Sequence, residues 1–398
     1  MNILFVCSFF PHPKCGHGTS TKVYNFIKGL STENRVDLCC FATEEEKELS
    51  VLLKPFCSEL KTVPLPKRET FKKVTDSLFS AKPRVAKSYF SLEFLEGLKY
   101  MLAKTHYDIV HFDISYVGQY IDYLDLPKGT KTILFEDDCL LFLVKGRREG
   151  AAGILRDPLL FIDYIKTRRY QPALWRKFDL ILTITHSNKK TIEGFNHGLS
   201  IKVIPNGVDC AYFKRDSALS NEPLLIFTGN YWHRPNEDAV VYFIDRIYPK
   251  IKNTVKDIRL QLLGKNITPA IKKRVSSDSS ISYGGFVDDV RPYLEKAAVF
   301  IAPIRTGKGM RGKVLEAMSM SIPVVSTELG LDGIGAQDKI HALLANEPGK
   351  FSEVTLEAIR DAALRKALGQ NARILMESKY DWNIITGELE DTYKELLT

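Results

Sequence analysis

The chain has 398 residues, of which 44% are hydrophobic and 26% are charged, a composition typical of a globular protein with two or three domains. This composition excludes collagen-like, disulfide-scaffold, coiled-coil and wholly disordered proteins. The net charge of +8 is uneven: residues 1–205 carry 30 basic and 23 acidic side chains (net +7), and the rest carries 26 and 25 (net +1). A negatively charged partner is therefore expected to meet the first half of the chain.

The first ten residues are apolar, but they lack a basic leading segment and a small-residue cleavage site. They predict a first strand rather than a signal peptide. No run approaches about 18 uncharged apolar residues, the length that a membrane-spanning helix needs. The seven cysteines contain no C-x-x-C pair, which predicts reduced thiols, no metal site and a cytoplasmic protein.

Strand-like and helix-like segments alternate through the first half. Apolar positions spaced three and four residues apart predict an amphipathic helix over 19–30, and Ser91 is placed to cap a later helix. Short apolar runs predict parallel strands that are buried on both faces. The predicted strands of this half are residues 2–7, 35–42, 60–65, 108–112, 132–135, 180–184 and 202–204.

The same alternation starts again after a boundary near residues 205–207. The predicted strands are residues 224–228, 259–263, 281–283, 299–302 and 323–326, and the helices between them are 236–251, 288–297 and 312–320. Two blocks of alternating strands and helices predict an α/β protein with two doubly wound, Rossmann-like sheets. Ligands of such sheets bind at the carboxyl ends of the strands, so a site is expected in a central cleft between two facing domains.

A glycine-containing loop follows the first strand. Gly16 and Gly18 would let backbone N–H groups approach an anion at the start of the next helix. The loop is not G-x-G-x-x-G, and no acidic residue ends the second strand, which argues against a dinucleotide dehydrogenase. A plain turn between strand and helix remains the alternative.

The strand over 224–228 leads into a second segment with a glycine at its start. Gly229 permits close approach of a ligand at the strand end, while Pro235 and Asn236 are read as helix-start signals, with Asn236 as the cap.

Residues 302–318 form the densest segment. Four basic side chains crowd a predicted helix N-terminus, an arrangement that opposes the helix dipole: Arg305, Lys308, Arg311 and Lys313. A diphosphate would satisfy both these cations and the free N–H groups. Glu316, one helical turn on, could accept hydrogen bonds from sugar hydroxyls or could pair with Lys313. A salt-bridged loop is the alternative to an anion site.

The order of these motifs resembles the GT-B glycosyltransferases, specifically retaining glycosyltransferase family 4 (glycosyl transferases group 1). Residues 204–209 with Tyr212 and Phe213 are similar to that family's domain junction. The similar segments of the second half are Gly229 with Pro235 and Asn236, Gly264, residues 285–290, Pro303, residues 309–318, 323–326 and 342–346, and the ending around Tyr380 and Trp382. No single motif is decisive, but their order and spacing together are specific.

The resemblance implies an acceptor-binding domain over 1–205, with the C-terminal helix 380–398 packing back on it, and a nucleotide-sugar donor domain over 206–379. It implies a UDP- or GDP-linked donor sugar as substrate and no cofactor. The implied diphosphate-binding residues are Arg305, Lys308, Gly309, Arg311 and Lys313, with Gly16 and Gly18 closing over the phosphates. The implied nucleoside- and sugar-binding residues are Glu316 at the ribose, Gly229, Asn230, His17, and Gly285, Phe286 and Val287 by the base.

Two positions depart from the family pattern. Lys308 stands where the family usually has a Glu that touches the donor sugar, which leaves the sugar's identity open. The run Glu136, Asp137 and Asp138 stands where many members have a His near the sugar. These three are the candidate catalytic residues, in an orienting or proton-accepting role. The alternative is that they are solvated or helix-capping carboxylates at a strand end.

The expected activity is retaining, metal-independent transfer of a hexosyl or related sugar to a lipid-linked or polysaccharide acceptor. Basic and aromatic residues over 61–90, and basic residues over 145–169, suit an anionic membrane surface, so peripheral contact at its inner face is a hypothesis beside plain solvated charge. The runners-up are another GT-B activity, such as a nucleotide-sugar epimerase, and a non-catalytic sugar-nucleotide-binding subunit. No nucleic-acid recognition motif appears.

Overall fold

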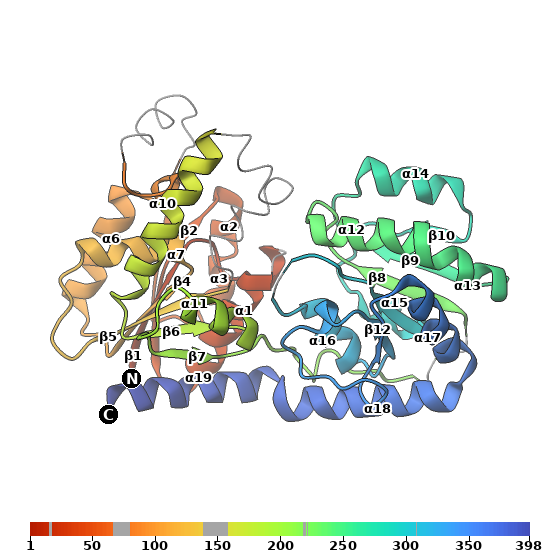
Figure 1. Ribbon diagram of the computed structural model, residues 1–398. Coiled ribbons are helices and arrows are strands. Elements are labelled where there is room, and N and C mark those ends of the chain that lie inside the picture. Colours follow the sequence, from red (N-terminus) through yellow and green to blue (C-terminus); the bar gives the residue numbers. More distant parts are fainter. Residues whose placement is uncertain (16–17, 67–79, 138–157, 218–219, 221, 308) are drawn as a thin grey trace. The chain divides into compact units, whose positions relative to one another are not determined.

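The computed structural model describes residues 1–15, 18–66, 80–137, 158–217, 220, 222–307 and 309–398. The chain divides into two compact units: unit 1 is Met1–Pro205 with Ile385–Thr398, and unit 2 is Asn206–Ile384. Each unit is a parallel sheet with helices packed against it (Figure 1). Within the described ranges, no helix is both long enough and apolar enough to cross a membrane.

Unit 1 contains a seven-stranded parallel sheet in the order β3-β2-β1-β4-β5-β6-β7. After β1 the chain adds β2 and β3 on one side of it. It then crosses to β4, on the other side of β1, and adds β5, β6 and β7 beyond it. The carboxyl ends of β1 and β4 therefore flank the switch point of the sheet, the usual ligand position in this architecture. The strands are β1 (Asn2–Cys7), β2 (Arg35–Ala42), β3 (Glu59–Pro64), β4 (Ile109–Asp113), β5 (Lys131–Glu136), β6 (Leu180–Thr183) and β7 (Ile201–Val203).

Helices cover both faces of this sheet. Phe94 and Leu98 of α6 and Trp175 of α10 pack on one face. On the other face, Phe26 of α1 contacts Phe135 of β5, and Tyr393 of α19 reaches β4. The described helices of unit 1 are η1 (Pro13–Cys15), α1 (Gly18–Leu30), α2 (Glu44–Glu48), α3 (Ser50–Leu53), α5 (Arg84–Ser88), α6 (Leu92–Lys104), α7 (Ser115–Gly118), η2 (Gln119–Tyr123), α10 (Pro158–Trp175), α11 (His186–Glu193) and, from Ile385 onward, α19 (Trp382–Leu397).

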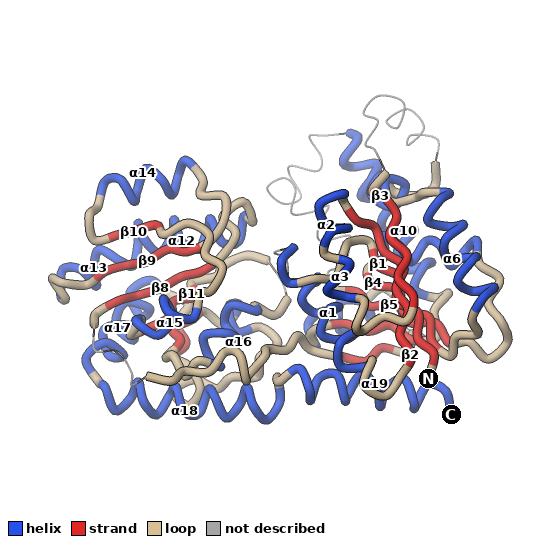
Figure 2. The backbone as a smooth tube through the Cα atoms, turned by 180° about the vertical axis from the view of Figure 1, so that it is seen from behind, coloured by secondary structure: helices blue, strands red, loops and turns tan. Residues whose placement is uncertain are grey.

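Unit 2 contains a six-stranded parallel sheet in the order β10-β9-β8-β11-β12-β13. Its strands are β8 (Leu224–Thr228), β9 (Arg259–Leu263), β10 (Ile281–Tyr283), β11 (Val299–Ala302), β12 (Val324–Ser326) and β13 (Leu343–Leu344). Its helices are α12 (Arg234–Tyr242), η3 (Phe243–Ile247), α13 (Tyr248–Thr254), α14 (Pro269–Ser277), α15 (Arg291–Lys296), α16 (Gly312–Ser319), η4 (Leu329–Leu331), α17 (Pro348–Arg360) and α18 (Ala362–Lys379). Figure 2 shows the strands of each sheet among their helices.

Two predicted helices of unit 2 differ from the structure. The helix expected over 236–251 is broken by a π-helical turn, η3, since Pro249 has no N–H to donate to the preceding turn. Its first part begins earlier, at Arg234, with His233 as N-cap, so the prediction that Asn236 caps it is wrong. The helix expected over 288–297 begins at Arg291, because Asp289 instead accepts hydrogen bonds from the backbone and side chain of that residue.

Candidate functional site

Three glycines bring bare backbone to the carboxyl ends of β8, β9 and β10. Gly229 N–H donates to Leu263 O over 2.9 Å, and Gly264 N–H donates to Gly285 O over 2.7 Å. Gly264 has φ +134°, and a Cβ on it would lie 1.7 Å from the carbonyl oxygen of Gly229. Gly285 has φ +72° and open space where a side chain would be. A ligand can therefore approach the main chain at Gly285, whereas the space beside Gly229 is filled by the side chains of Asn236 and Lys313.

Lys313, in the first turn of α16, reaches the end of β8 beside Gly229. Its Nζ donates to Thr228 O (2.9 Å) and to Asn236 Oδ1 (2.6 Å), and it lies 3.9 Å from the centre of the Phe227 ring. These three neighbours are all neutral. Burial, and then the charge of Arg311, hold the pKa of Lys313 well below its ordinary value. An anion placed here would relieve both effects.

Glu316 follows Lys313 by one helical turn. Burial raises the pKa of Glu316 to about 7, although Lys313 acts in the opposite direction. The two side chains form no ion pair in the part of the chain that the structure describes. A salt bridge between them, the alternative considered from the sequence, is thus not observed.

Asn230 lies in a small amide network next to Lys313. Its Oδ1 accepts from Trp232 N–H (3.2 Å) and from Asn266 Nδ2 (3.1 Å), and its carbonyl accepts from Asn236 Nδ2 (2.9 Å). Asn236 therefore links Asn230 to Lys313. The network orients polar atoms around Gly229.

The cationic loop before α16 is only partly free to bind an anion. Arg305 makes a bidentate pair with Asp238 of α12 (2.6 and 3.1 Å) and lies 4.0 Å from the Tyr242 ring centre. Arg311 donates to Thr306 O over 3.4 Å. Gly309 has φ +92°, a left-handed conformation that favours glycine, and Lys308 lies outside the described residues. Arg305 is therefore charge-compensated within the protein, and Arg311 stands at the N-cap of α16.

Phe286 presents a flat ring near the glycine cluster. The residue is 59% exposed, and Lys265 Nζ lies 4.0 Å from its ring centre. Val287, in contrast, packs against the buried core of α15 and α16. Of the two, Phe286 is the one that a planar ligand could contact.

In unit 1, Lys22 of α1 is fully buried between two carboxylates. Its Nζ lies 3.0 Å from Asp113 Oδ1 and 2.5 Å from Asp137 Oδ1. Burial alone would lower the pKa of Lys22, but Asp113 and Asp137 outweigh it and raise the pKa. Burial raises the pKa of Asp113 to about 7 against the effect of Lys22. Asp137, a candidate catalytic residue, is therefore held in a salt bridge at the end of β5.

Glu136 points away from this cluster. It is 1% exposed, and its Oε2 accepts hydrogen bonds from Ser115 Oγ and from Trp175 Nε1 (3.1 Å). Burial raises its pKa to about 7, against the effect of these donors. This environment is that of a structural carboxyl group beneath α7 and α10.

Several sequence-predicted residues lie outside the described ranges. Gly18 is described and begins α1, whereas Gly16, His17 and Asp138 are not described. The same applies to the basic residues over 67–79 and 138–157.

Sequence reasoning missed several residues around the two lysines. In unit 1 it missed Lys22 itself and its partner Asp113. In unit 2 it missed the two acceptors of Lys313, which are Asn236 and the Thr228 carbonyl. One signal was available for Lys22, because it falls on the apolar stripe of its helix, four residues before Phe26. A lysine in that position indicates a buried acidic partner. Asp113 ends β4 next to the end of β5, so it was a candidate for that partner.

Comparison with known proteins shows which sequences and structures the chain resembles. Residues 222–361 match the family model of glycosyl transferases group 1. An uncharacterized 44.6 kDa protein in the cps region of Klebsiella pneumoniae is 23% identical over 284 residues, which cover 69% of this chain and 71% of that protein. The capsular polysaccharide biosynthesis glycosyltransferase CapM of Staphylococcus aureus is 23% identical over 237 residues, 54% of this chain and 57% of CapM.

Solved structures share the fold along the whole chain. Sucrose-phosphate synthase from Thermosynechococcus elongatus matches with a TM-score of 0.73 at 16% identity, over 100% of this chain and 99% of that one. A point mutant of TarM from S. aureus, solved with Fondaparinux, alpha-GlcNAc-glycerol and UDP, matches with a TM-score of 0.70 at 12% identity over 100% of both chains. The predicted α/β fold of two Rossmann-like sheets is confirmed as the GT-B fold.

Fold and family model together support a glycosyltransferase of the GT-B class. Within that class, the matched segment of unit 2 is similar to glycosyl transferases group 1.

Proposed function

We propose that the chain is a retaining glycosyltransferase of family 4 that moves a hexosyl or related sugar from a UDP- or GDP-linked donor to an acceptor hydroxyl. The observation that carries the proposal is Lys313, a largely buried ammonium beside Gly229 whose hydrogen-bond partners are all neutral. A diphosphate would give this ammonium group the negatively charged partner that its neutral hydrogen-bond acceptors do not provide. The UDP in the TarM structure and the CapM relative support a nucleotide-sugar donor and a glycan acceptor.

The chemistry needs stabilisation of a leaving diphosphate. As the bond between sugar and phosphate breaks, negative charge grows on the phosphate oxygens. Lys313, Arg311 and the N-terminus of α16 are fixed by the fold before the reaction, so they can stabilise this charge without reorganisation. Because cationic side chains take that role, we propose transfer without a metal or cofactor. Lys308 and Gly309 would complete the loop, and Arg305 would support it through its pair with Asp238.

The donor's other groups would contact residues at the strand ends. The nucleobase would lie on Phe286 next to Gly285 and Val287, with Glu316 at the ribose and with Gly229 and Asn230 lining the approach. Gly16 and Gly18 would close over the phosphates, and His17 would contact the nucleoside or the sugar.

Unit 1 would bind the acceptor, which we propose to be a lipid-linked or polysaccharide glycan. Retention of configuration would follow if the acceptor attacks on the face that the diphosphate leaves, with a phosphate oxygen taking the acceptor proton. Asp137 or Asp138 would orient the acceptor hydroxyl. The excess of basic residues in 1–205 supports peripheral contact with the inner face of the membrane, in the cytoplasm.

The proposal is tested by incubating the protein with a panel of UDP- and GDP-sugars without acceptor and measuring release of nucleoside diphosphate. Slow hydrolysis of one donor, lost in Lys313→Gln and kept in Lys273→Gln, is the expected result. Proton NMR of the product then reads the anomeric configuration. An epimerised nucleotide sugar would instead identify an epimerase, and donor binding without turnover would identify a non-catalytic subunit.

A further inference from the structure

Three charged side chains meet at the switch point of the unit 1 sheet. Lys22 comes from α1, which follows β1, while Asp113 ends β4 and Asp137 directly follows β5. The side chains of Lys22 and Asp113 are fully buried, whereas 15% of the Asp137 side chain is exposed. Ligands of a doubly wound sheet approach at this edge. Asp137 is therefore the member of the cluster that a substrate can reach.

Lys22 pairs with one oxygen of Asp137. Oδ1 lies 2.5 Å from Lys22 Nζ. Oδ2 accepts no hydrogen bond among the described residues and is not one of the buried unpaired oxygens in that part of the chain, so solvent reaches it. The Asp137 main chain is also fixed, because its carbonyl accepts a hydrogen bond from Asn188 Nδ2 of α11 over 2.5 Å. The cluster thus presents one carboxylate oxygen in a defined direction.

The backbone beside Asp113 is strained. Ile114 has φ +74° and ψ 144°, a conformation that a β-branched residue rarely adopts. Its N–H nevertheless donates to Phe135 O over 2.8 Å, which ties the end of β4 to β5. Such strain persists only where the surrounding structure enforces it, and it is concentrated at functional sites. It therefore supports a functional role for the place where Asp113 and Asp137 meet Lys22.

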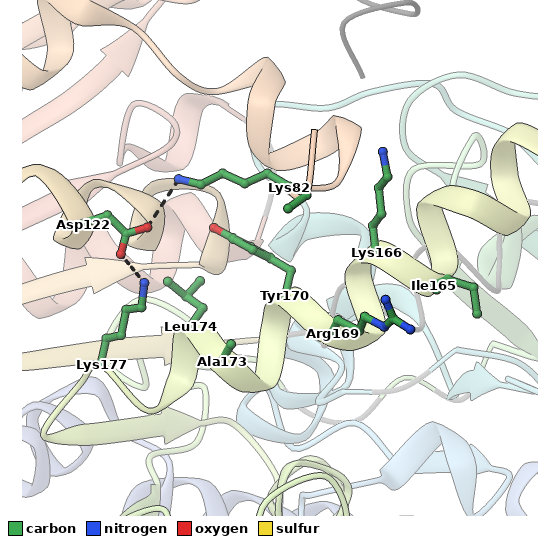
Figure 3. Close-up of a pocket in the computed structure, with 10 residues that line it drawn as sticks. Lys82, Asp122, Ile165, Lys166, Arg169, Tyr170, Ala173, Leu174 and Lys177 are labelled. Atoms are coloured by element: carbon green, nitrogen blue, oxygen red, sulfur yellow. Dashed lines mark hydrogen bonds and ion pairs between the residues drawn. The ribbon is translucent and has the colours of Figure 1, made fainter. Parts of the chain in front are cut away.

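A second charged cluster of unit 1 has the opposite ratio of charges. It lines a cavity of about 480 Å³ along α10, where Asp122 pairs with both Lys82 (3.4 Å) and Lys177 (Figure 3). Each oxygen of Asp122 is engaged by one of these lysines, in contrast to Asp137. The Asp122 cluster therefore offers a control for replacing an ion pair in unit 1.

We infer that Lys22 is a positioning residue, which fixes the Asp137 carboxylate so that its Oδ2 faces the acceptor. The inference rests on the proposed glycosyl transfer and names Asp137 as the orienting carboxylate. In that reaction the bond from sugar to phosphate breaks, the acceptor oxygen bonds to the sugar, and its proton passes to a phosphate oxygen. Asp137 takes no proton.

Asp137 instead accepts a hydrogen bond from a second O–H group of the acceptor. In a glycan this group is a hydroxyl beside the reacting one, and in water it is the other O–H bond. The hydrogen bond holds the acceptor with a lone pair of its reacting oxygen toward the sugar, which is the orientation that transfer needs. Without Lys22, the Asp137 side chain is free to turn, and this orientation is lost.

The test is a double-mutant cycle on nucleoside diphosphate release from the UDP- or GDP-sugar that the unchanged protein hydrolyses, with water as the acceptor. Lys22→Met is combined with Asp113→Asn, because replacing a buried ion pair as a unit leaves no uncompensated charge at Asp113. We expect this paired variant to lower kcat by about 10²-fold, the scale of a misplaced reacting group. Its KM for the donor should not change, since the proposed donor residues with described positions around Lys313 belong to unit 2.

Asp137→Asn should lower kcat by a similar factor. When it is added to the paired variant, kcat should fall no further, because Lys22 acts only through Asp137. A second pair, Lys22→Gln with Asp113→Asn, keeps a hydrogen-bond donor beside Asp137 and should retain part of the kcat. Thermal denaturation shows whether each variant is folded at the assay temperature.

The matched control is Lys82→Met with Asp122→Asn, which removes an ion pair of unit 1 far from Asp137 in the sequence and should leave kcat unchanged. If the losses from the paired Lys22 variant and from Asp137→Asn multiply, or if the control loses as much, Lys22 acts through the stability of unit 1 and the inference is wrong. An unchanged kcat in both Lys22 variants also overturns it. If the unchanged protein releases no nucleoside diphosphate from any donor, the proposed function fails and the inference fails with it.

Discussion

Lys22 and Lys313 show how surroundings give one residue type two roles. Both ammonium groups lie near the carboxyl end of a strand, Lys22 fully buried and Lys313 largely buried. Lys22 has two carboxylate partners, so its pKa is raised, whereas Lys313 has only neutral partners and its pKa is lowered. A buried charge with carboxylate partners is balanced within the fold, and removal of one partner is costly. A charge with only neutral partners can still attract an anionic ligand.

Replacement of Lys313 tests the second role. In Lys313→Gln, we expect kcat/KM for nucleoside diphosphate release to fall by about 10²–10³, the usual cost of removing one group that stabilises a developing oxyanion. The thermal transition should hardly change, because a glutamine can still donate to the Thr228 carbonyl. Lys273→Gln, on an exposed turn of α14, is the control. Unchanged turnover in Lys313→Gln would remove Lys313 from the chemistry.

Replacement of Lys22 tests the first role. Lys22→Met leaves Asp113 and Asp137 without their cation, which should lower the free energy of unfolding at pH 8 by about 3–5 kcal/mol. The loss should be smaller at pH 5, because Asp113, with a pKa of about 7, is then protonated. Urea denaturation at both pH values measures this. An equal loss at both would mean that Asp113 does not titrate in this range.

Glu136 gives a pH prediction of defined sign. Its pKa is raised from 4.5 to about 7 by folding, so its ionisation opposes the folded state and stability falls as pH rises from about 4.5 to 7. Glu136→Gln resembles the protonated form and can still accept from Ser115 and Trp175. We expect it to stabilise the protein at pH 8 by about 1–3 kcal/mol relative to its effect at pH 4. Parallel stability curves for the two proteins would contradict this.

Residue types and spacing pointed to the glycines and cations at the strand ends of unit 2, but not to how the cations are partnered. Arg305 and Lys313 look alike in sequence, yet Arg305 pairs with Asp238, 67 residues away, and Lys313 pairs with neutral atoms 77 and 85 residues away. Such partners are set by tertiary packing, which local sequence patterns do not reveal. The same holds for Asn236, which a capping rule assigned to the helix and which instead holds Lys313.

At the scale of elements, the strands were predictable except for the two-residue β13, and several helices were not. Short apolar runs in a parallel sheet are bounded by polar residues at both ends, so the expected limits of β1, β2, β8, β9, β10 and β11 agree with the structure. Helix α10 carries Pro172 within it and buries polar residues such as Thr167 and Gln171 beside Leu174. It therefore shows no simple apolar stripe from which a helix could be predicted.

The packing of β8 against β9 depends on a glycine. An alanine at Gly264 would need an unfavourable φ and would place its Cβ against the Gly229 carbonyl. We expect Gly264→Ala to destabilise unit 2 by about 3 kcal/mol or more. Gly349→Ala in α17, where a Cβ meets nothing closer than 3.8 Å, should be neutral or slightly stabilising. Thermal denaturation of both variants is the measurement, and equal transitions would contradict the prediction.

At the scale of the molecule, the last helix joins two parts of the chain that are distant in sequence. Ile385, Leu389 and Tyr393 of α19 are fully buried, and Tyr393 Oη lies 2.5 Å from His111 Nδ1. These residues belong to unit 1 although they follow all of unit 2 along the chain.

Loss of the Tyr393 side chain should therefore act on the first unit. We expect Tyr393→Ala to destabilise unit 1 by about 3–5 kcal/mol, as for other large aromatic side chains removed from a core. Hydrogen exchange should accelerate in peptides from β4 and β5 and stay unchanged in those from β8 and β11. Tyr100→Ala, at a tyrosine of α6 that is 57% exposed, is the control. Equal acceleration in both units would contradict the prediction.

The position of α19 in the sequence also sets an order of events during synthesis. His111 is made 282 residues before Tyr393, and at about 5–20 residues per second the ribosome needs tens of seconds to cover that distance. For that time, the part of the first sheet that α19 covers in the finished protein is left uncovered, and the His111 imidazole has no phenol partner. The second unit has all of its residues by Ile384, so the half of the protein that is made first is the last to be completed. Chaperone dependence in this protein is thus expected to arise from the N-terminal unit.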